Sequence, residues 1–168
     1  MLAVARRAGS SKESLYAWFE NKDGMVAELI RRQAARTNTA VAAALEDDHE
    51  PREMLVAIAT NLLDLLVGET SLALNRAAMS SPELAAVLRR DGRHTTGPLI
   101  ERYLATLAKA HTIDMDDPAE AFCLLYGLVI QDTQIRALLG ETPPTRAARA
   151  RHATLAVDRF LALTARRD

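Results

Sequence analysis

A short polar cluster near the N-terminus holds the side chains best suited to recognise a ligand by hydrogen bonding. Lys12, Glu13 and Ser14 follow one another at the expected start of a short helix over residues 12–19. Lysine can donate to guanine O6 and N7, glutamate can accept from the cytosine amino group, and serine can do either. In the first turn of a helix that enters the major groove, these side chains reach base edges. The pattern therefore indicates a capacity for direct readout of duplex DNA.

Three further donors are expected one turn later and at the start of the next helix. Tyr16 carries a hydroxyl, Trp18 an indole N–H and Lys22 an ammonium group. These donors, together with the amides of a helix N-terminus, are suited to phosphate oxygens. We expect such contacts to set the register of the protein on DNA rather than to read its sequence.

Two short helices must position these groups. Residues 2–8 are predicted to form a helix that Gly9 ends, because glycine accepts the left-handed backbone of a helix terminus. Ser10 or Ser11 can cap the helix of residues 12–19. Two short helices joined by a tight turn that contains glycine predict a helix-turn-helix.

The remaining sequence predicts only helices. The chain is 49% hydrophobic but 4% aromatic, and its Ala, Leu and Val residues recur at helical spacing. Residues 96–98 (TGP) are expected to separate two helices, and Gly140 to end another. The expected helices cover residues 22–45, 51–67, 71–79, 82–93, 98–110, 118–139 and 145–165. The predicted fold class is all-α, with a head and connecting helix in residues 1–45 and a helical bundle in residues 46–168.

The composition restricts the class of protein. The net charge is −1, but residues 1–36 hold seven Lys and Arg against four Asp and Glu, which leaves +3 there and −4 in the remainder. A basic segment on an acidic body is typical of a nucleic-acid binder with a separate regulatory or assembly domain. No signal-peptide pattern and no run of about 20 apolar residues occurs, so we expect a cytoplasmic protein without a membrane partner.

No constellation in the sequence is typical of an enzyme or a metal site. The four histidines are scattered, without an i, i+4 pair: His49, His94, His111 and His152. The acidic run of residues 114–117 lacks the glycine and terminal glutamate of a calcium loop, and we expect it to cap a helix. Cys123 lies in an apolar stretch without a basic neighbour, so a buried, inert thiol is expected. We therefore expect no enzymatic activity, no metal and no cofactor.

The start of the chain also carries an ordered set of small, polar and aromatic residues. The set comprises Ala8-Gly9, Ser11-Lys12, Leu15-Tyr16, Phe19 and Lys22. In this order and spacing, it resembles the DNA-binding head of the tetracycline-repressor (TetR) family of one-component bacterial regulators. The resemblance covers about residues 1–30, and residues 127–140 have a weaker likeness to the family's body. It implies that Lys12, Glu13 and Ser14 read bases, and that phosphates are contacted by Ser11, Tyr16, Trp18 and Lys22.

One part of the family's head is missing from the sequence. The resemblance implies a further helix that would precede Met1, so the head is expected to be incomplete and to bind DNA poorly in this form. Each large apolar side chain left in water forgoes about 1.5–3 kcal/mol. The side chains expected to lose a packing partner are Leu2, Val4, Leu15, Phe19 and Met25.

Two helices are expected to pair with their symmetry mates in a four-helix dimer interface. Residues 121–130 are apolar on almost every side, and the last helix has an alanine-rich stripe. A homodimer would place two heads on a pseudo-palindromic site. The alternative is a single buried core helix. The expected interface residues are Cys123, Leu124, Leu128, Ala153, Val157 and Phe160.

The resemblance further implies an effector cavity within the body. Candidate lining residues are apolar or amphipathic and lie on helices that should converge. They are Leu62, Leu66, Asn75, Met79, Leu99, Tyr103, Phe122 and Tyr126. For any one of them, a plain core position is the alternative. Only Asn75 with Tyr103 hints at a ligand that forms hydrogen bonds, and Arg76 could either face an anionic group or be solvated.

These expectations combine into one function and one alternative. The first is a bacterial transcriptional regulator, a repressor by the family's usual mode, that binds a double-stranded operator as a homodimer and is released by a small-molecule effector. The alternative is a helical ligand carrier or protein-interaction module without DNA binding, in which Tyr16 and Trp18 are ordinary surface aromatics. Affinity for DNA that falls steeply with salt would separate the two.

Overall fold

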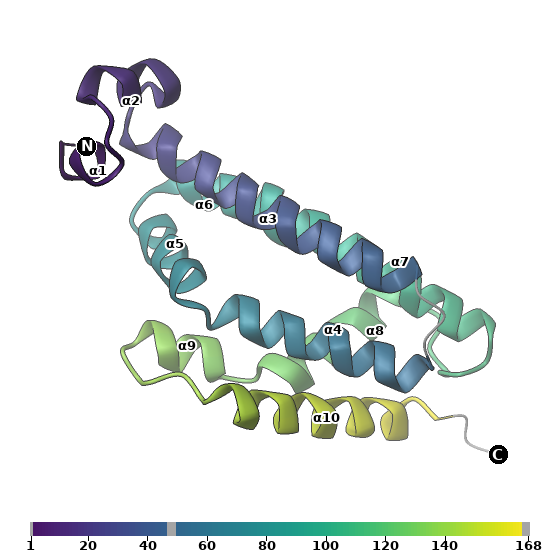
Figure 1. Ribbon diagram of the computed structural model, residues 1–168. Helices are drawn as coiled ribbons and strands as arrows, with labels where there is room; N and C mark the ends of the chain where they lie inside the picture. The colour runs from purple at the N-terminus through teal and green to yellow at the C-terminus, as the bar shows by residue number, and fades with distance from the viewer. Residues whose placement is uncertain (1, 47–49, 166–168) are drawn as a thin grey trace.

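The computed structural model describes residues 2–46 and 50–165, and the regular elements in these ranges are all helical (Figure 1). They are α1 (Leu2–Arg7), α2 (Lys12–Phe19), α3 (Lys22–Glu46), α4 (Pro51–Leu66), α5 (Glu69–Met79), α6 (Pro82–Leu88), the π-helix η1 (Arg89–Arg93), α7 (His94–Lys109), α8 (Pro118–Ile130), α9 (Thr133–Leu138) and α10 (Arg146–Leu163). The predicted all-α fold is confirmed. His49, in the turn expected before α4, lies outside the described residues.

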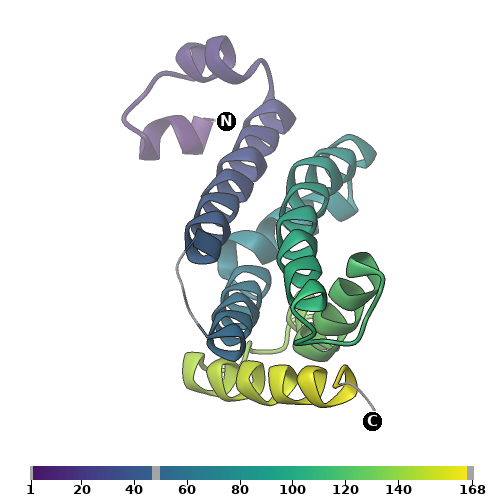
Figure 2. The ribbon, with the colours of Figure 1, turned by 90° about the vertical axis from the view of Figure 1, so that its right-hand side faces the viewer.

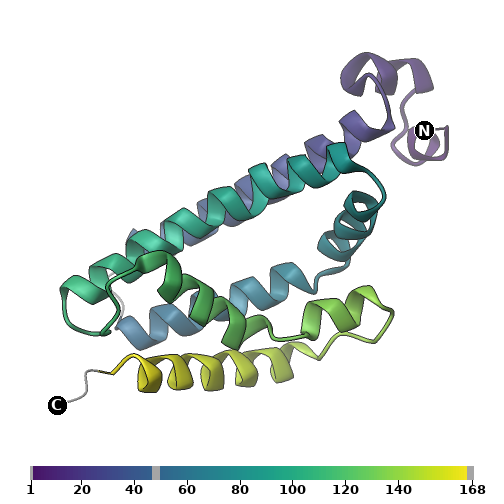
Figure 3. The same cartoon turned by 180° about the vertical axis from the view of Figure 1, so that it is seen from behind.

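The helices form a small head on a longer body. Figures 1 and 3 show α1 and α2 at one end of α3, far from the C-terminal end of α10. The long helix α3 lies against α6 and α7, while α10 packs on α4 and α8. In the side view of Figure 2, α10 closes the end of the body opposite the head. Helix α3 is therefore shared by the head and the body.

Local hydrogen bonds fix the two short helices of the head. Gly9 ends α1 with a φ of +60°, a left-handed conformation that glycine adopts without strain. The Ser11 hydroxyl accepts from the Ser14 N–H at 3.0 Å and caps α2. The Asn21 side chain accepts from the Gly24 N–H at 2.8 Å at the start of α3. The predicted helix-turn-helix segment and its caps are confirmed.

The break predicted at residues 96–98 is wrong. Helix α6 continues through η1 into α7 as one run, which Figure 3 shows from behind, and Pro98 lies inside α7. Proline removes one N–H donor from a helix, and here it follows the π-helix η1 within the same run. The Thr95 hydroxyl donates to the carbonyls of Asp91 at 2.8 Å and Arg90 at 3.3 Å. A hydroxyl thus bonds the carbonyls of the wide turn, and the helix continues.

The single helix predicted for residues 118–139 is two helices. Helix α8 ends at Ile130, Gln131 has a φ of 48°, and α9 starts at Thr133. Tertiary contacts hold the second piece, because Arg76 of α5 donates to the carbonyls of Ala137 at 2.9 Å and Leu138 at 3.3 Å. No glycine or proline marks this break, so the apolar pattern could not predict it.

Apolar side chains of α4, α7, α8 and α10 form most of the main core, and Val41 of α3 joins them. Fully buried members include Leu55, Ile100, Leu104, Leu125 and Phe160. A smaller cluster joins α3, α5 and α6 through Ala27, Ala78 and Leu84. Burial of one Leu or Phe contributes about 1.5–3 kcal/mol, so the main core supplies most of the stability of the body.

The most apolar helices of the body are short. Among the described residues, no single helix is both long and apolar enough to cross a membrane. Helices α4 and α5 reach the required length and composition only as a pair, and they are bent by 58° at the break between them. The buried face of α4 belongs to the main core.

Phe160 provides a test of the core. Its side chain is fully buried within one subunit, so we expect Phe160→Ala to lower the free energy of unfolding by about 3–5 kcal/mol, through lost burial and the cavity left behind. Urea unfolding followed by circular dichroism measures the change. Arg159→Ala, at an exposed position of the same helix, should change it by less than about 0.5 kcal/mol. Equal effects of the two substitutions would contradict this placement of Phe160.

Candidate functional site

The polar and aromatic side chains of α2 cover the outer surface of the head. Lys12 and Glu13 are exposed, and Tyr16 and Trp18 are exposed by 42% and 66%. The Lys12 ammonium lies 5.5 Å from the centroid of the Tyr16 ring, a cation–π contact that holds the ammonium along the helix. The two rings and the charges therefore face solvent and not the core.

The start of α2 carries a fixed negative group. A hydrogen bond from its own backbone N–H lowers the pKa of the Glu13 carboxyl, and the Ser11 hydroxyl and the nearby Lys12 act in the same direction. An ionised carboxylate only accepts hydrogen bonds. The Ser14 hydroxyl lies 3.1 Å from the Ser11 hydroxyl and is half-buried, so it is already engaged in the cap.

The apolar side chains of the head differ in their burial. Leu2 and Val4 are exposed by 56% and 40%, whereas Leu15 is buried, and Phe19 and Met25 are half-buried. The expectation that Leu15 lacks a packing partner is wrong, because Leu15 is buried on α2, which contacts both α1 and α3. Lys22, the remaining phosphate candidate, is exposed in the first turn of α3.

A cavity of about 270 Å³ lies in the body, bordered by α3 to α9. Its volume is close to the lower end of the range for small-molecule sites, about 300–1,000 Å³. The wall is mostly apolar and includes Leu62, Leu65, Leu66, Leu74 and Phe122. The polar lining side chains besides the Tyr126 phenol are Gln33, Ser71, Asn75, Arg89, Thr96 and Gln134.

Most, but not all, of the predicted lining residues reach this cavity. Those that do are Leu62, Leu66, Asn75, Phe122 and Tyr126. Met79 does not, because it ends α5 and is exposed by 70%. Leu99 and Tyr103 do not, because they pack against the main core. The predicted pair of Asn75 and Tyr103 is therefore not assembled, and Asn75 instead donates to the Ser71 carbonyl at 2.9 Å.

Two groups of lining residues were missed. Ile30, Gln33 and Ala34 come from α3, and their i, i+3, i+4 spacing was the signal that this helix is more than a connector. Gly97, in the predicted break, instead lies inside α7 and allows close packing. A Cβ added there would lie 3.3 Å from the Phe122 ring, so glycine lets the ring approach α7.

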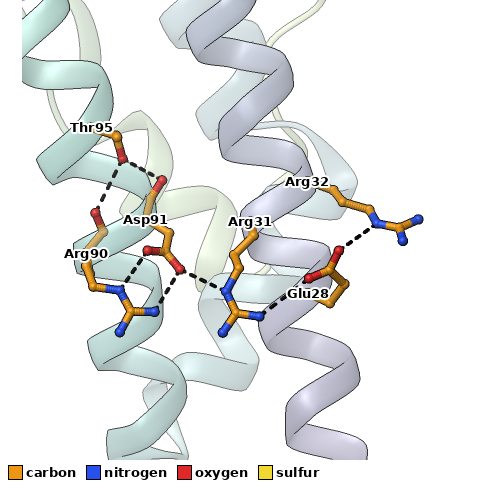
Figure 4. A network of polar contacts seen from close by, with 6 residues as sticks. All are labelled: Glu28, Arg31, Arg32, Arg90, Asp91 and Thr95. Carbon is orange, nitrogen blue, oxygen red and sulfur yellow. Dashed lines mark hydrogen bonds and ion pairs between the residues drawn. The ribbon is translucent and has the colours of Figure 1, made fainter. Parts of the chain in front are cut away.

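An ion-pair network connects α3 to the π turn beside the cavity (Figure 4). The Arg31 Nε lies 3.4 Å from an oxygen of Asp91 in η1, and Arg90 donates to the same carboxylate at 2.8 and 3.0 Å. Arg90, and to a smaller extent Arg31, lower the pKa of the Asp91 carboxyl, which favours its ionised form. On α3, Glu28 accepts from Arg32 at 3.0 Å. The network thus joins the helix that carries the head to the turn that borders the cavity.

The predicted interface residues divide into two groups. Cys123 is exposed on α8, contrary to the buried thiol expected, and Leu124 and Leu128 are half-buried. The prediction is wrong for three residues of α10, which lie in the core of the subunit with no surface left for a partner: Ala153, Val157 and Phe160. The alanine-rich stripe faces α4 and α8 of the same chain.

The described residues contain no cluster typical of a metal site. No group of three or more His, Cys, Asp or Glu side chains in residues 2–46 and 50–165 could hold a metal ion. The acidic run before α8 acts as a cap, since the Asp117 carboxylate accepts from the Ala119 N–H at 2.8 Å.

Comparison with known proteins places the chain among regulators of transcription. Residues 53–164 match the sequence profile of the C-terminal domain of AefR-like transcriptional repressors. A TetR transcriptional regulator from Agrobacterium tumefaciens is 34% identical, with a TM-score of 0.70, over 95% of this chain and 80% of that one. No curated protein matches the sequence.

Two more solved structures share the fold. A protein described as a TetR-family transcriptional regulator from Mesorhizobium loti superposes with a TM-score of 0.84 at 22% identity, over 98% of this chain and 86% of that one. The flavonoid-responsive regulator FrrA superposes with a TM-score of 0.71 at 26% identity, over 100% and 87%. With the matched profile over most of the body and the Agrobacterium relative, these findings show that the chain belongs to the TetR family of transcriptional regulators.

Proposed function

We propose that this regulator is a repressor that binds a pseudo-palindromic DNA operator as a homodimer and is released by a small molecule in the body cavity. The observation that carries the proposal is the continuity of α3. The exposed face of α2 lies at one end of α3, and three residues of α3 line the cavity. In this division, residues 1–45 form the head and connecting helix, residues 46–168 form the effector and dimer body, and α3 serves both.

Contacts to DNA are assigned to the exposed residues of the head. Lys12 and Glu13 read base edges from the first turn of α2. Ser14 does so when its hydroxyl leaves the Ser11 hydroxyl and forms a hydrogen bond with a base instead. The phosphates are held by Ser11, Tyr16, Trp18 and Lys22. The ring contact that steadies the Lys12 ammonium supports this role, because a preoriented donor loses less entropy on binding.

The path from cavity to head is short in this proposal. A ligand contacts Ile30, Gln33 and Ala34 directly, and it also borders η1, which pairs with α3 through Arg31 and Asp91. Movement of α3 changes the position of the head and hence the fit of two heads to one operator. The name of FrrA states that it responds to flavonoids, and this supports a small organic effector here.

The dimer interface is assigned to the outward face of α8 and the neighbouring surface of α10. Cys123, Leu124 and Leu128 lie on this face with Gly127, and Leu155 of α10 is exposed by 53%. Small residues allow two helices to approach closely, and the leucines supply apolar area. A C2 pairing of this face presents two heads.

DNA recognition is tested by separating base reading from phosphate binding. We expect Lys12→Ala to cost about 1–3 kcal/mol and to relax base preference at one position of each half-site. We expect Lys22→Ala to weaken binding to all duplexes about equally and to reduce the slope of log K against log salt by about 1. Genomic selection followed by fluorescence anisotropy at several salt concentrations provides both readouts.

The control is Lys109→Ala, at an exposed lysine that ends α7, on the side of the body away from the head. It should leave affinity and salt slope unchanged. The assays are run with the chain and with a version that carries the helix expected before Met1. If neither form selects any duplex, the proposal of operator binding fails and the ligand-carrier alternative is favoured.

Gly127 provides the test of the interface. A Cβ added at this position has no neighbour within 4 Å in the subunit, so Gly127→Arg should fold normally while its side chain blocks a partner. We expect sedimentation velocity to show a concentration-dependent dimer for the unmodified chain and a monomer for Gly127→Arg. Gly127→Ala should keep the dimer and favour the helix by about 1 kcal/mol. A dimer that persists in Gly127→Arg would place the interface elsewhere.

A further inference from the structure

The charged groups around the body cavity identify the class of ligand that it takes. We propose that the effector is an anionic amphiphile, a small molecule with an apolar body and one carboxylate, and that Arg89 binds the carboxylate. This inference rests on the proposed role of the cavity as an effector site. It adds the charge of the ligand and the residue that reads that charge.

The wall of the cavity suits an apolar body. Leu62, Leu66 and Leu74 come from two helices, and Phe122 of α8 adds an aromatic ring to the wall. The Phe122 and Tyr126 rings meet edge to face, with centroids 5.9 Å apart. Each Å² of apolar ligand surface buried here contributes about 25 cal/mol, so the body of the ligand supplies the affinity.

The cavity contains one formal charge. Among its described lining residues, Arg89 is the only one with an ionised side chain, and none is acidic. A cationic ligand therefore finds no counter-charge in the wall and meets a like charge. An anionic ligand finds a guanidinium, the group whose planar fork matches a carboxylate.

The Arg89 guanidinium is available, unlike its neighbours. It makes no hydrogen bond or ion pair with any residue in the described part of the chain, whereas Arg90 pairs with Asp91. Arg76, the other arginine that could face an anionic group, instead donates to a carbonyl at the end of α9. Arg89 is exposed, so it stands where the cavity meets solvent and a carboxylate stays partly hydrated.

Several neutral polar groups of the lining are already bonded within the protein. Asn75 donates to the Ser71 carbonyl at 2.9 Å, and the Gln134 amide donates to the Leu66 carbonyl at 3.3 Å. The Thr96 hydroxyl donates to Asn38 at 2.6 Å. A ligand would have to displace these bonds to use the same donors, whereas it can bind Arg89 without such a loss.

The position of Arg89 also connects the ligand to the head. Arg89 is the first residue of η1, and Asp91 of the same turn pairs with Arg31 of α3 (Figure 4). A carboxylate held by Arg89 therefore contacts the turn that is joined to the helix carrying α1 and α2.

Three probes that share one apolar body test the charge preference. Phenylbutyrate, phenylbutanamide and phenylbutylamine carry an anionic, a neutral and a cationic group on the same chain. Isothermal titration calorimetry with the full chain near neutral pH, without DNA, measures their affinities. We expect the acid to bind roughly three- to tenfold more tightly than the amide, and the amine to bind most weakly, because the charge pair is partly exposed.

Variants of Arg89 show whether this residue causes the preference for the acid over the amide. Arg89→Gln should remove the preference of acid over amide while leaving the affinity for the amide and the melting temperature unchanged, since Arg89 makes no bond in the described structure. Arg89→Lys should keep part of the preference. Arg102→Gln, at an exposed arginine of α7 that does not line the cavity, should behave as the unmodified chain.

Three results would overturn the proposal. They are equal affinity for acid and amide, a preference that survives Arg89→Gln, and no binding of the acid at millimolar concentration. Because the titrations contain no DNA, such a failure leaves operator binding to its own assay. A normal acid preference with no DNA binding would instead reject the regulator role and keep the ligand class.

Discussion

The architecture depends on one unbroken helix. Lys22–Glu46 has 25 residues and is therefore about 37 Å long, with the head at its start and cavity-lining side chains halfway along. It packs on α6 and α7, shares a small cluster with α5 and α6 through Ala27, and adds Val41 to the main core. One helix therefore joins the exposed residues of the head to the wall of the cavity.

The ion pairs around η1 position α3 relative to η1 but contribute little to the stability of the fold. The Arg31 side chain is half exposed and that of Asp91 is 20% exposed, and such pairs contribute about 0–1 kcal/mol. The apolar core supplies several times that amount for each buried side chain. Breaking the ion pair between α3 and η1 therefore costs little free energy, which suits a contact that transmits changes between the cavity and the head.

Local chemistry predicted much of the fold, and tertiary contacts decided the rest. Gly9, Ser11 and Asn21 marked true boundaries because their effect needs only neighbouring backbone. The break at Gln131 precedes a helix that Arg76 holds from α5, and the run through Pro98 continues from the π turn η1; neither the contact nor the turn has a sequence signal. The stripe around Val157 shows a further limit, because periodicity indicates that a face is covered but not which chain covers it. Cavity residues of α4, α5 and α8 were predicted because these helices were expected to converge. Arg89 was missed because the sequence does not distinguish an arginine beside a cavity from any other exposed arginine.

The close approach of Phe122 to Gly97 affects how such a cavity diversifies. A methyl group at position 97 would lie 3.3 Å from the Phe122 ring, so the ring would have to shift by a few tenths of an ångström. Because Gly97 and Phe122 both line the cavity, their contact sets part of the space that is open to a ligand. Exchange of Gly97 for a larger residue in a descendant protein would therefore favour a smaller effector, without altering the residues assigned to charge or DNA recognition.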